Sequence, residues 1–257
     1  MTTNLQGPPI TRPFLTAEWR YLVLLNFRVP PESLAPYVPA GTILDPWQGD
    51  TWLSLVGFQF LETRLLGVPI PFHQNFSEIN LRFYVRPLTD DRRAVVFLRE
   101  IVPHPAIALT ARRIYNEPYV TRRMVAEAPR VETARPGRVR YRWRHRGRWN
   151  SIGATAVGDP TPIQDGSAEE FISEHYWGYT AQRDGSTVEY QVEHPRWRVW
   201  PVTDAEFDVD VGAEYGAVFA PLLARPPASV LLAEGSAIRV GRPRRLPSGQ
   251  LSGPDVR

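Results

Sequence analysis

The chain has 257 residues, of which 43% are hydrophobic and 22% charged, and its formal net charge is +3. All 30 Lys+Arg positions are Arg, and there is no Cys, which excludes Schiff-base lysines, thiolate nucleophiles and disulfides. The small net charge makes nucleic-acid binding an unfavoured class, and no apolar run is long enough to span a bilayer. With a polar stretch at residues 1–13, these features predict a cytoplasmic protein.

Strand patterns dominate the first half of the chain. Apolar and aromatic side chains recur in the manner of β-strands in four segments: residues 19–28, 51–61, 78–86 and 93–101. The last two are joined by a turn at Asp90-Asp91. Short helices are predicted over residues 31–37, which start with Pro-Glu, and over residues 106–115.

The second half is also rich in strands. They are predicted at residues 119–126, 138–149, 152–157, 175–182, 187–194 and 236–240. Ser167 is a predicted N-cap of a helix over residues 166–174, and residues 213–215 suit another short helix. Many strands with few, short helices predict a mostly β (α+β) fold, an antiparallel barrel or cone. We expect one domain over residues 1–246 and a flexible tail over 247–257.

One predicted strand carries an unusual polar face. Glu78, Asn80, Arg82 and Tyr84 alternate with Ile79, Leu81, Phe83 and Val85, so the two sets point to opposite faces. On the outside of the protein this would be an ordinary solvated face, and the pattern alone favours that interpretation. Inside a barrel, Glu78 and Arg82 would be buried charges that need a network or a ligand.

A second cluster surrounds the predicted hairpin. His175 and Tyr176 precede it, and His194 and Trp197 follow it, so the hairpin brings histidines and aromatic rings together. Core aromatics with satisfied imidazoles would look the same. The five His residues show no metal-ligand spacing, so we expect no metal site. The chain also lacks a nucleophile elbow, a phosphate loop and a dinucleotide fingerprint.

Basic residues gather only once, over residues 138–148. Every Arg of this segment occupies an even position, so one face of a strand would be basic and the other would carry Val139, Tyr141, Trp143 and His145. A solvated strand face above a core face is favoured. The alternative is a surface for phosphates or acidic partners.

Several motifs together resemble a known family. They are Trp19 to Phe27 followed by Pro-Pro-Glu-Ser-Leu, Trp52 to Phe58, Phe76 to Val85, Ala111 to Tyr119, His175-Tyr176, and His194 to Trp197. In this order they resemble the YqjF-like family of bacterial proteins of unknown function, over roughly residues 14–245. The block from Glu78 to Val85 is the most specific part of the resemblance.

That family is similar in fold to acetoacetate decarboxylase, which implies a β-barrel or cone with a central cavity. The resemblance therefore favours a cavity-facing position for Glu78 and Arg82. Acetoacetate decarboxylase uses a Schiff-base lysine, and this chain has none. If the cavity is present, its chemistry is not that of a lysine-dependent decarboxylase.

Two functional hypotheses follow. In the first, a small anionic ligand, such as a carboxylate or keto acid, occupies the cavity. The protein either binds this ligand without turnover or converts it by acid/base chemistry of the lyase or isomerase type. That chemistry would need no metal, Schiff base or other cofactor. Arg82, with Arg112 or Arg113, would hold the carboxylate. Glu78 would hold the arginine or act as general base, and His175 or His194 would be a proton carrier near neutral pH. The remaining candidate ligand-binding residues are His73, Asn80, Tyr84, Tyr119, Tyr176 and Trp197.

In the second hypothesis the chain is an interaction or regulatory module. The basic face of residues 138–148 would then bind an acidic protein or a nucleic acid, with a steep salt dependence. The sequence leaves self-association into a homo-oligomer open under either hypothesis.

Overall fold

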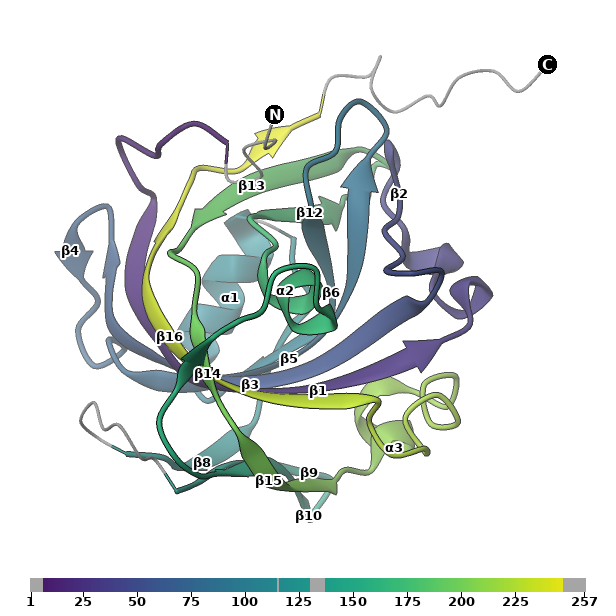
Figure 1. The fold of residues 1–257 in the computed structure, drawn as a ribbon. Coiled ribbons are helices and arrows are strands. Elements are labelled where there is room, and N and C mark those ends of the chain that lie inside the picture. The colour runs from purple at the N-terminus through teal and green to yellow at the C-terminus, as the bar shows by residue number, and fades with distance from the viewer. Residues whose placement is uncertain (1–6, 115, 130–136, 247–257) are drawn as a thin grey trace.

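The computed structural model describes residues 7–114, 116–129 and 137–246, whose strands form two sheets (Figure 1). Strands make up most of the regular structure, and the helices are short, so the predicted mostly β class is confirmed. The predicted tail, residues 247–257, lies outside the described residues. The single-domain organisation stays a prediction.

The larger sheet curls into an uneven barrel. Its long strands are, in order, β16 (Ser229–Val240), β1 (Leu15–Val29), β3 (Thr51–Leu65), β5 (Phe76–Pro87) and β6 (Ala94–Val102), each antiparallel to the next. The hairpin of β12 (Trp177–Ala181) and β13 (Thr187–Glu193) closes the ring. β12 pairs in parallel with β6, and β13 pairs with β16, each through a short contact.

Shorter elements complete the barrel and its ends. They are two 3-10 turns (Pro31–Ser33 and Ala35–Tyr37), β2 (Thr42–Leu44), β4 (Val68–Pro69), α1 (Pro105–Ile114), β7 (Tyr119–Thr121), β11 (Thr161–Pro162), α2 (Ala168–Ser173), β14 (Arg198–Trp200), α3 (Val211–Tyr215) and β17 (Arg244–Arg245). The Ser167 side chain accepts a hydrogen bond from the Glu170 amide and so caps α2, as predicted. No helix in the described part of the chain is long and apolar enough to cross a membrane.

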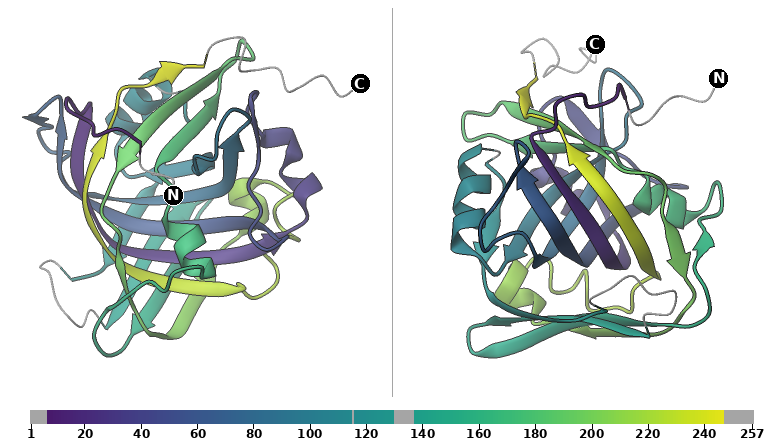
Figure 2. Two further views of the ribbon diagram at one scale, coloured as in Figure 1. Left: turned by 45° about the horizontal axis from the view of Figure 1, so that its top comes forward. Right: turned by 90° about the vertical axis from the view of Figure 1, so that its left-hand side faces the viewer.

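The smaller sheet lies against the outside of the barrel. It runs β15 (Val202–Asp208), β10 (Arg148–Ala156), β9 (Arg138–His145) and β8 (Arg123–Glu127), beneath the barrel strands in Figures 1 and 2. Tyr141 and Trp143 of this sheet share one hydrophobic core with Ile79 and Leu81 of β5. Gly57 permits the contact, because a Cβ there would lie 2.8 Å from the Tyr141 ring.

This second layer decides which face of β5 points inward. The smaller sheet covers the apolar side chains of β5, so the polar set must face the interior of the barrel. Glu78, Asn80, Arg82 and Tyr84 are accordingly all buried. The solvated-face interpretation that the local pattern favoured is wrong, and the inward orientation implied by the family resemblance is correct.

Three predicted elements are divided in the structure. Residues 119–126 split at Arg122, where the chain leaves β7 in the larger sheet and enters β8 in the smaller one. Residues 138–149 form a hairpin, because Arg146 and Gly147 make a turn with positive φ angles of 47° and 84°. The predicted helix over residues 31–37 is two separate 3-10 turns.

Two strand predictions were incomplete. The last strand begins at Ser229 and not at residue 236, and β15 had no counterpart among the predictions. The predicted helix over residues 106–115 corresponds to α1, with residue 115 outside the described residues.

Candidate functional site

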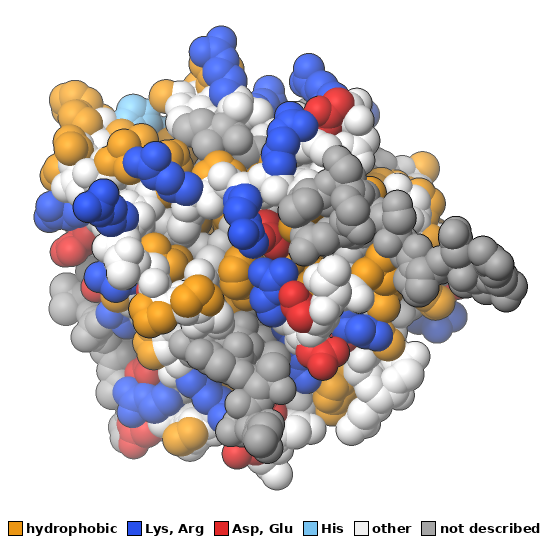
Figure 3. Space-filling view, turned by 90° about the horizontal axis from the view of Figure 1, so that it is seen from above, with side chains coloured by type: hydrophobic (Ala, Val, Ile, Leu, Met, Phe, Trp, Pro, Cys, Tyr) orange, Lys and Arg blue, Asp and Glu red, His pale blue; other side chains and the backbone are white. Residues whose placement is uncertain are grey.

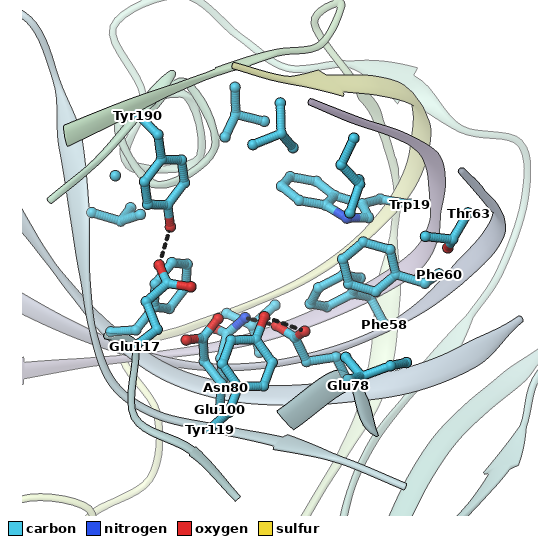
Figure 4. Close-up of a pocket in the computed structure, with 18 of the residues that line it drawn as sticks. Trp19, Phe58, Phe60, Thr63, Glu78, Asn80, Glu100, Glu117, Tyr119 and Tyr190 are labelled. Atoms are coloured by element: carbon cyan, nitrogen blue, oxygen red, sulfur yellow. Dashed lines mark hydrogen bonds between the residues drawn. The ribbon is translucent and has the colours of Figure 1, made fainter. Parts of the chain in front are cut away.

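A cavity of about 270 Å³ occupies the interior of the barrel. Its walls combine an aromatic part, which includes Trp19, Phe58 and Phe60, with a polar part built on β5 and its neighbours (Figure 4). Ala106 and Thr110 of α1 line it and are exposed, so the cavity opens beside this helix. Such a mixed, concave pocket is the usual form of a small-molecule site.

The polar wall follows from strand register. Asn80 of β5 is paired with Glu100 of β6, and Glu100 is paired with Tyr119 of β7, so the three side chains form one row across the sheet. Glu78 and Arg82 flank Asn80 on the same face of β5. All except Tyr119 are nearly excluded from solvent, and all five line the cavity.

Three carboxyl groups meet at this wall. Glu78 accepts a hydrogen bond from Asn80 Nδ2 at 3.1 Å and another from the Tyr119 hydroxyl at 3.1 Å. Glu117, in the segment before β7, accepts a hydrogen bond from the Tyr190 hydroxyl of β13 (Figure 4). Glu100 Oε2 is buried without a hydrogen-bond partner among the described residues.

The Tyr190–Glu117 contact depends on a glycine. Gly178 of β12 is paired with Tyr190, and a Cβ at Gly178 would lie 2.3 Å from Cζ of the Tyr190 ring. The ring therefore lies across the space that a side chain at position 178 would fill, and its hydroxyl reaches Glu117.

Burial dominates the protonation of these acids. It raises the pKa of Glu78 to about 7, against the hydrogen bonds from Asn80 and Tyr119. Burial, reinforced by the charge of Glu78, raises the pKa of Glu117 to about 8. The pKa of Glu100 is raised well above its usual range by burial and by the charges of Glu117 and Glu78. Glu117 therefore stays largely protonated at neutral pH, whereas Glu78 is partly ionised there.

Arg82 is the one arginine among the residues that line the cavity. Its side chain donates a hydrogen bond from Nη2 to the Ile172 carbonyl at 3.3 Å, while Nε is buried without a partner. Its guanidinium lies 5.8 Å from the centre of the Tyr84 ring. Within the described residues, no carboxylate lies within ion-pair distance of Arg82, although the residue is only 8% exposed.

The two predicted histidines also line the cavity. His194 lies between rings, 4.4 Å from Trp197 and 4.7 Å from Tyr176 between ring centres. Burial lowers the pKa of His194 to about 4, and burial with the nearby Arg82 charge lowers the pKa of His175 well below its usual range. Both imidazoles are thus neutral at pH 7, so the groups that titrate near neutrality are the carboxyls.

Other predicted residues are distributed unevenly. His73 and Tyr119 line the cavity, with the His73 ring centre 4.6 Å from that of His104. Arg112 and Arg113 are exposed on α1 and do not line it, so the predicted clamp of two or three arginines reduces to Arg82. The Arg112 side chain instead donates a hydrogen bond from Nε to the Tyr119 carbonyl of β7.

Tyr84 and Tyr176 are buried behind the cavity wall. The Tyr84 hydroxyl shares a 2.6 Å hydrogen bond with Ser54, and the Tyr176 hydroxyl donates to Glu174. Both tyrosines therefore support the wall and do not face the ligand space.

The cavity residues that sequence reasoning missed include Glu100, Glu117 and Tyr190. Glu100 could have been found, because a turn centred on Asp90 places residue 100 opposite residue 80. Glu117 lies outside any periodic segment, and Tyr190 reaches the cavity only through the closure of β12 and β13 onto the barrel.

The basic segment is largely neutralised by its own sheet. Arg138 and Arg140 pair with Glu206 at 2.5 and 2.6 Å, and Arg148 pairs with Asp208. Its alternate residues Val139, Tyr141 and Trp143 are fully buried, as the solvated-strand interpretation predicts. Figure 3 shows the opposite end of the molecule, where the described arginines are also spread among acidic and apolar side chains. These observations favour the cavity over the basic segment as the functional site.

Comparisons with known proteins agree with this architecture. The model of DUF2071, a family described as uncharacterized conserved protein, matches residues 16–237. The uncharacterized protein YqjF of Bacillus subtilis (strain 168) is 24% identical over 218 residues, covering 82% of this chain and 86% of that protein.

Solved structures show the same fold. An acetoacetate decarboxylase-like enzyme from Sphingomonas wittichii RW1 matches with a TM-score of 0.63 and 13% identity, over 96% of this chain and 98% of the other. The enduracididine biosynthesis enzyme MppR complexed with pyruvate matches with a TM-score of 0.63 and 13% identity, over 96% and 94% of the two chains. The predicted resemblance in family and fold is confirmed.

Proposed function

Since this chain belongs to the DUF2071 family of uncharacterized conserved proteins, we propose a function from its own cavity: it binds a small carboxylate or keto acid there. Arg82 holds the carboxylate, and the aromatic wall takes the apolar part of the ligand. The structural similarity to an enzyme complexed with pyruvate, a keto acid, supports this ligand class.

The observation that carries the proposal is the unpaired charge of Arg82. Guanidinium groups stay protonated, and a buried cation without a counter-ion is costly. Arg82 is nearly excluded from solvent, lines the cavity and has a free Nε donor. A ligand carboxylate would supply both the missing charge and the missing acceptor.

Acid/base chemistry of the isomerase or lyase type fits the neighbouring groups. Glu78, with a pKa of about 7, is partly ionised at neutral pH, whereas Glu117, with a pKa of about 8, is largely protonated. For a keto acid, the Glu78 carboxylate would take a proton from the carbon beside the carbonyl. The C–H electron pair would form the enol double bond, and the carbonyl oxygen would take the proton of Glu117. This route needs no lysine, metal or other cofactor.

Binding is tested by calorimetry with pyruvate and short-chain carboxylates. We expect Arg82→Gln to weaken carboxylate binding roughly 30-fold or more, from the loss of a charge-assisted pair. Arg140→Gln, which alters an arginine paired with Glu206 on the smaller sheet, is the matched control and should bind as the wild type does. Equal affinity of Arg82→Gln and the wild type would rule out the proposed site.

Turnover is tested separately by proton exchange. Enolisation of pyruvate in D₂O replaces its methyl protons with deuterium, which NMR detects directly. We expect exchange with the wild type and its loss in Glu78→Gln. Binding without exchange would leave the protein a binder of the same ligand class.

A further inference from the structure

The carboxyl end of the cavity contains hydrogen-bond acceptors in excess of donors. The donors present, Asn80 Nδ2 and the hydroxyls of Tyr119, Tyr190 and Thr180, already bond to Glu78 and Glu117. Among the described residues, no arginine or histidine forms an ion pair with Glu78, Glu100 or Glu117. Protonation relieves part of this excess, because each protonated carboxyl gains one donor.

Asn80 gives a second, independent indication that a donor is missing. Its side chain is only 2% exposed and lines the cavity, yet its Oδ1 has no hydrogen-bond partner in the described chain. An amide oxygen cannot be satisfied by taking up a proton at neutral pH, and buried acceptors of this kind are normally paired. The unpaired acceptors Asn80 Oδ1 and Glu100 Oε2 come from a directly paired position of β5 and β6.

The opposite requirement is found two residues further along the same strand. Arg82 needs an anion, whereas Glu78, Glu100 and Asn80 need a donor, preferably a cationic one. Arg82 and Glu78 are four residues apart, so their Cα atoms are separated by roughly 13 Å. The cavity thus has an anion-binding pole and a cation-binding pole, both on one face of β5.

We propose that the ligand is zwitterionic, a short carboxylic or keto acid that carries a cationic amine, amidine or guanidine group at its other end. This inference rests on the proposed function, in which Arg82 holds the carboxylate. The cationic nitrogen donates to Glu100 Oε2 and Asn80 Oδ1. The partly ionised Glu78 supplies neighbouring negative charge, and Glu117 adds to it once it loses its proton near pH 8. A protonated nitrogen suits this pole because it offers donors and no acceptor.

The test uses three probes with matched carbon chains: pentanoate, 5-aminopentanoate and 1-aminopentane. Calorimetry at pH 8 should show that 5-aminopentanoate binds the wild type at least about tenfold more tightly than pentanoate does, a difference of about 1.4 kcal/mol. The double variant Glu100→Gln/Glu117→Gln should bind both acids equally. Glu174→Gln, a buried acid that does not line the cavity, is the control and should keep the amine's advantage.

The outcomes separate this inference from the proposed function. If pentanoate binding depends on Arg82 but 5-aminopentanoate binds no more tightly, the cation pole is overturned and the proposed function stands. The same conclusion follows if 5-aminopentanoate still binds more tightly than pentanoate in the double variant. If 1-aminopentane binds and needs Glu100 and Glu117, while pentanoate does not bind, the cation pole is supported. The proposal that the ligand is a carboxylate is then overturned. If no probe binds, including the four- and six-carbon homologues, both are overturned. Urea unfolding of each variant shows that it is folded.

Discussion

Buried acids occur in two regions of this molecule, with opposite surroundings. Glu214 of α3, between the two sheets, is fully buried and surrounded by donors: Trp143 Nε1 at 3.2 Å, Arg122 Nη2 at 3.1 Å and Arg99 Nη1 at 3.5 Å. The three cavity acids are as deeply buried but have no cation within ion-pair distance among the described residues. A satisfied buried charge joins structural layers, whereas unsatisfied ones in a cavity are available to a ligand.

The largest expected difference is in stability at neutral pH. Glu214→Gln should lower the free energy of unfolding by about 3 kcal/mol, because it leaves Arg122 and its neighbours without their counter-ion. Glu100→Gln should change it by less than about 1 kcal/mol or increase it, since burial keeps Glu100 protonated and no cation depends on it. Urea unfolding at pH 7 measures both. Equal losses would mean that the cavity acids are structural too.

The second prediction concerns the pH dependence of stability below pH 8. The pKa of Glu117 is raised from 4.5 unfolded to about 8 folded, so between these values the folded state binds more protons. Its contribution to stability is therefore complete below pH 4.5 and is lost as the pH rises through 8. Gln does not titrate, so Glu117→Gln should gain on the wild type by about 1.4 kcal/mol per pH unit between pH 4.5 and 8. Above pH 8 the difference should level off, because Glu117 is then ionised in both states.

Urea unfolding between pH 6.5 and 9.5 measures this difference, which should increase up to about pH 8 and then stay constant. The buried histidines do not interfere, because their lowered pKa values confine their effect to pH below about 6.5. A difference between the variant and the wild type that is already constant from pH 6.5 to 8 would show that Glu117 is not a strained acid. It would then resemble Glu214 in kind.

Local sequence patterns predicted the fold class and most strands, since alternation and turn residues are local signals. The inward orientation of β5 was beyond them, because both of its faces are buried and the second sheet that covers Ile79 and Leu81 is distant in sequence. The basic segment shows the same limit. Alternation identified the core residues of β9, but the alternation continues through the turn at Arg146-Gly147, so one strand was predicted where the structure has a hairpin.

Prediction of the site was limited for a related reason. Glu78, Asn80 and Arg82 are adjacent on one strand, so periodicity alone placed them on one face. Glu117 and Tyr190 meet only because the hairpin β12–β13 closes onto β6 and β16. Arg112 and Arg113 appeared suitable by charge, yet they are exposed on α1 and do not line the cavity. Charge type indicated the chemistry, but tertiary closure selected the residues.

The smallest effect should come from the tyrosine that supports the cavity acid. Tyr190→Phe keeps the ring over Gly178 and removes only the hydrogen bond to Glu117, so the free energy of unfolding should fall by roughly 1 kcal/mol. That hydrogen bond lowers the pKa of Glu117, so its loss should extend the decline in stability, which ends near pH 8 in the wild type, to a higher pH.

Urea unfolding across the same pH range measures both effects of Tyr190→Phe, and Glu117→Gln provides the control background. In that background the pH shift must vanish, because position 117 no longer titrates.

Tyr179→Phe offers a matched comparison, since the Tyr179 hydroxyl donates at 3.0 Å to Glu189, an acid already paired with Arg92 and Arg244. A decline that stays at the same pH in Tyr190→Phe would separate Tyr190 from the titration of Glu117. The strain at this wall would then come from burial alone, and the cavity would differ from the Glu214 network only in its missing cations.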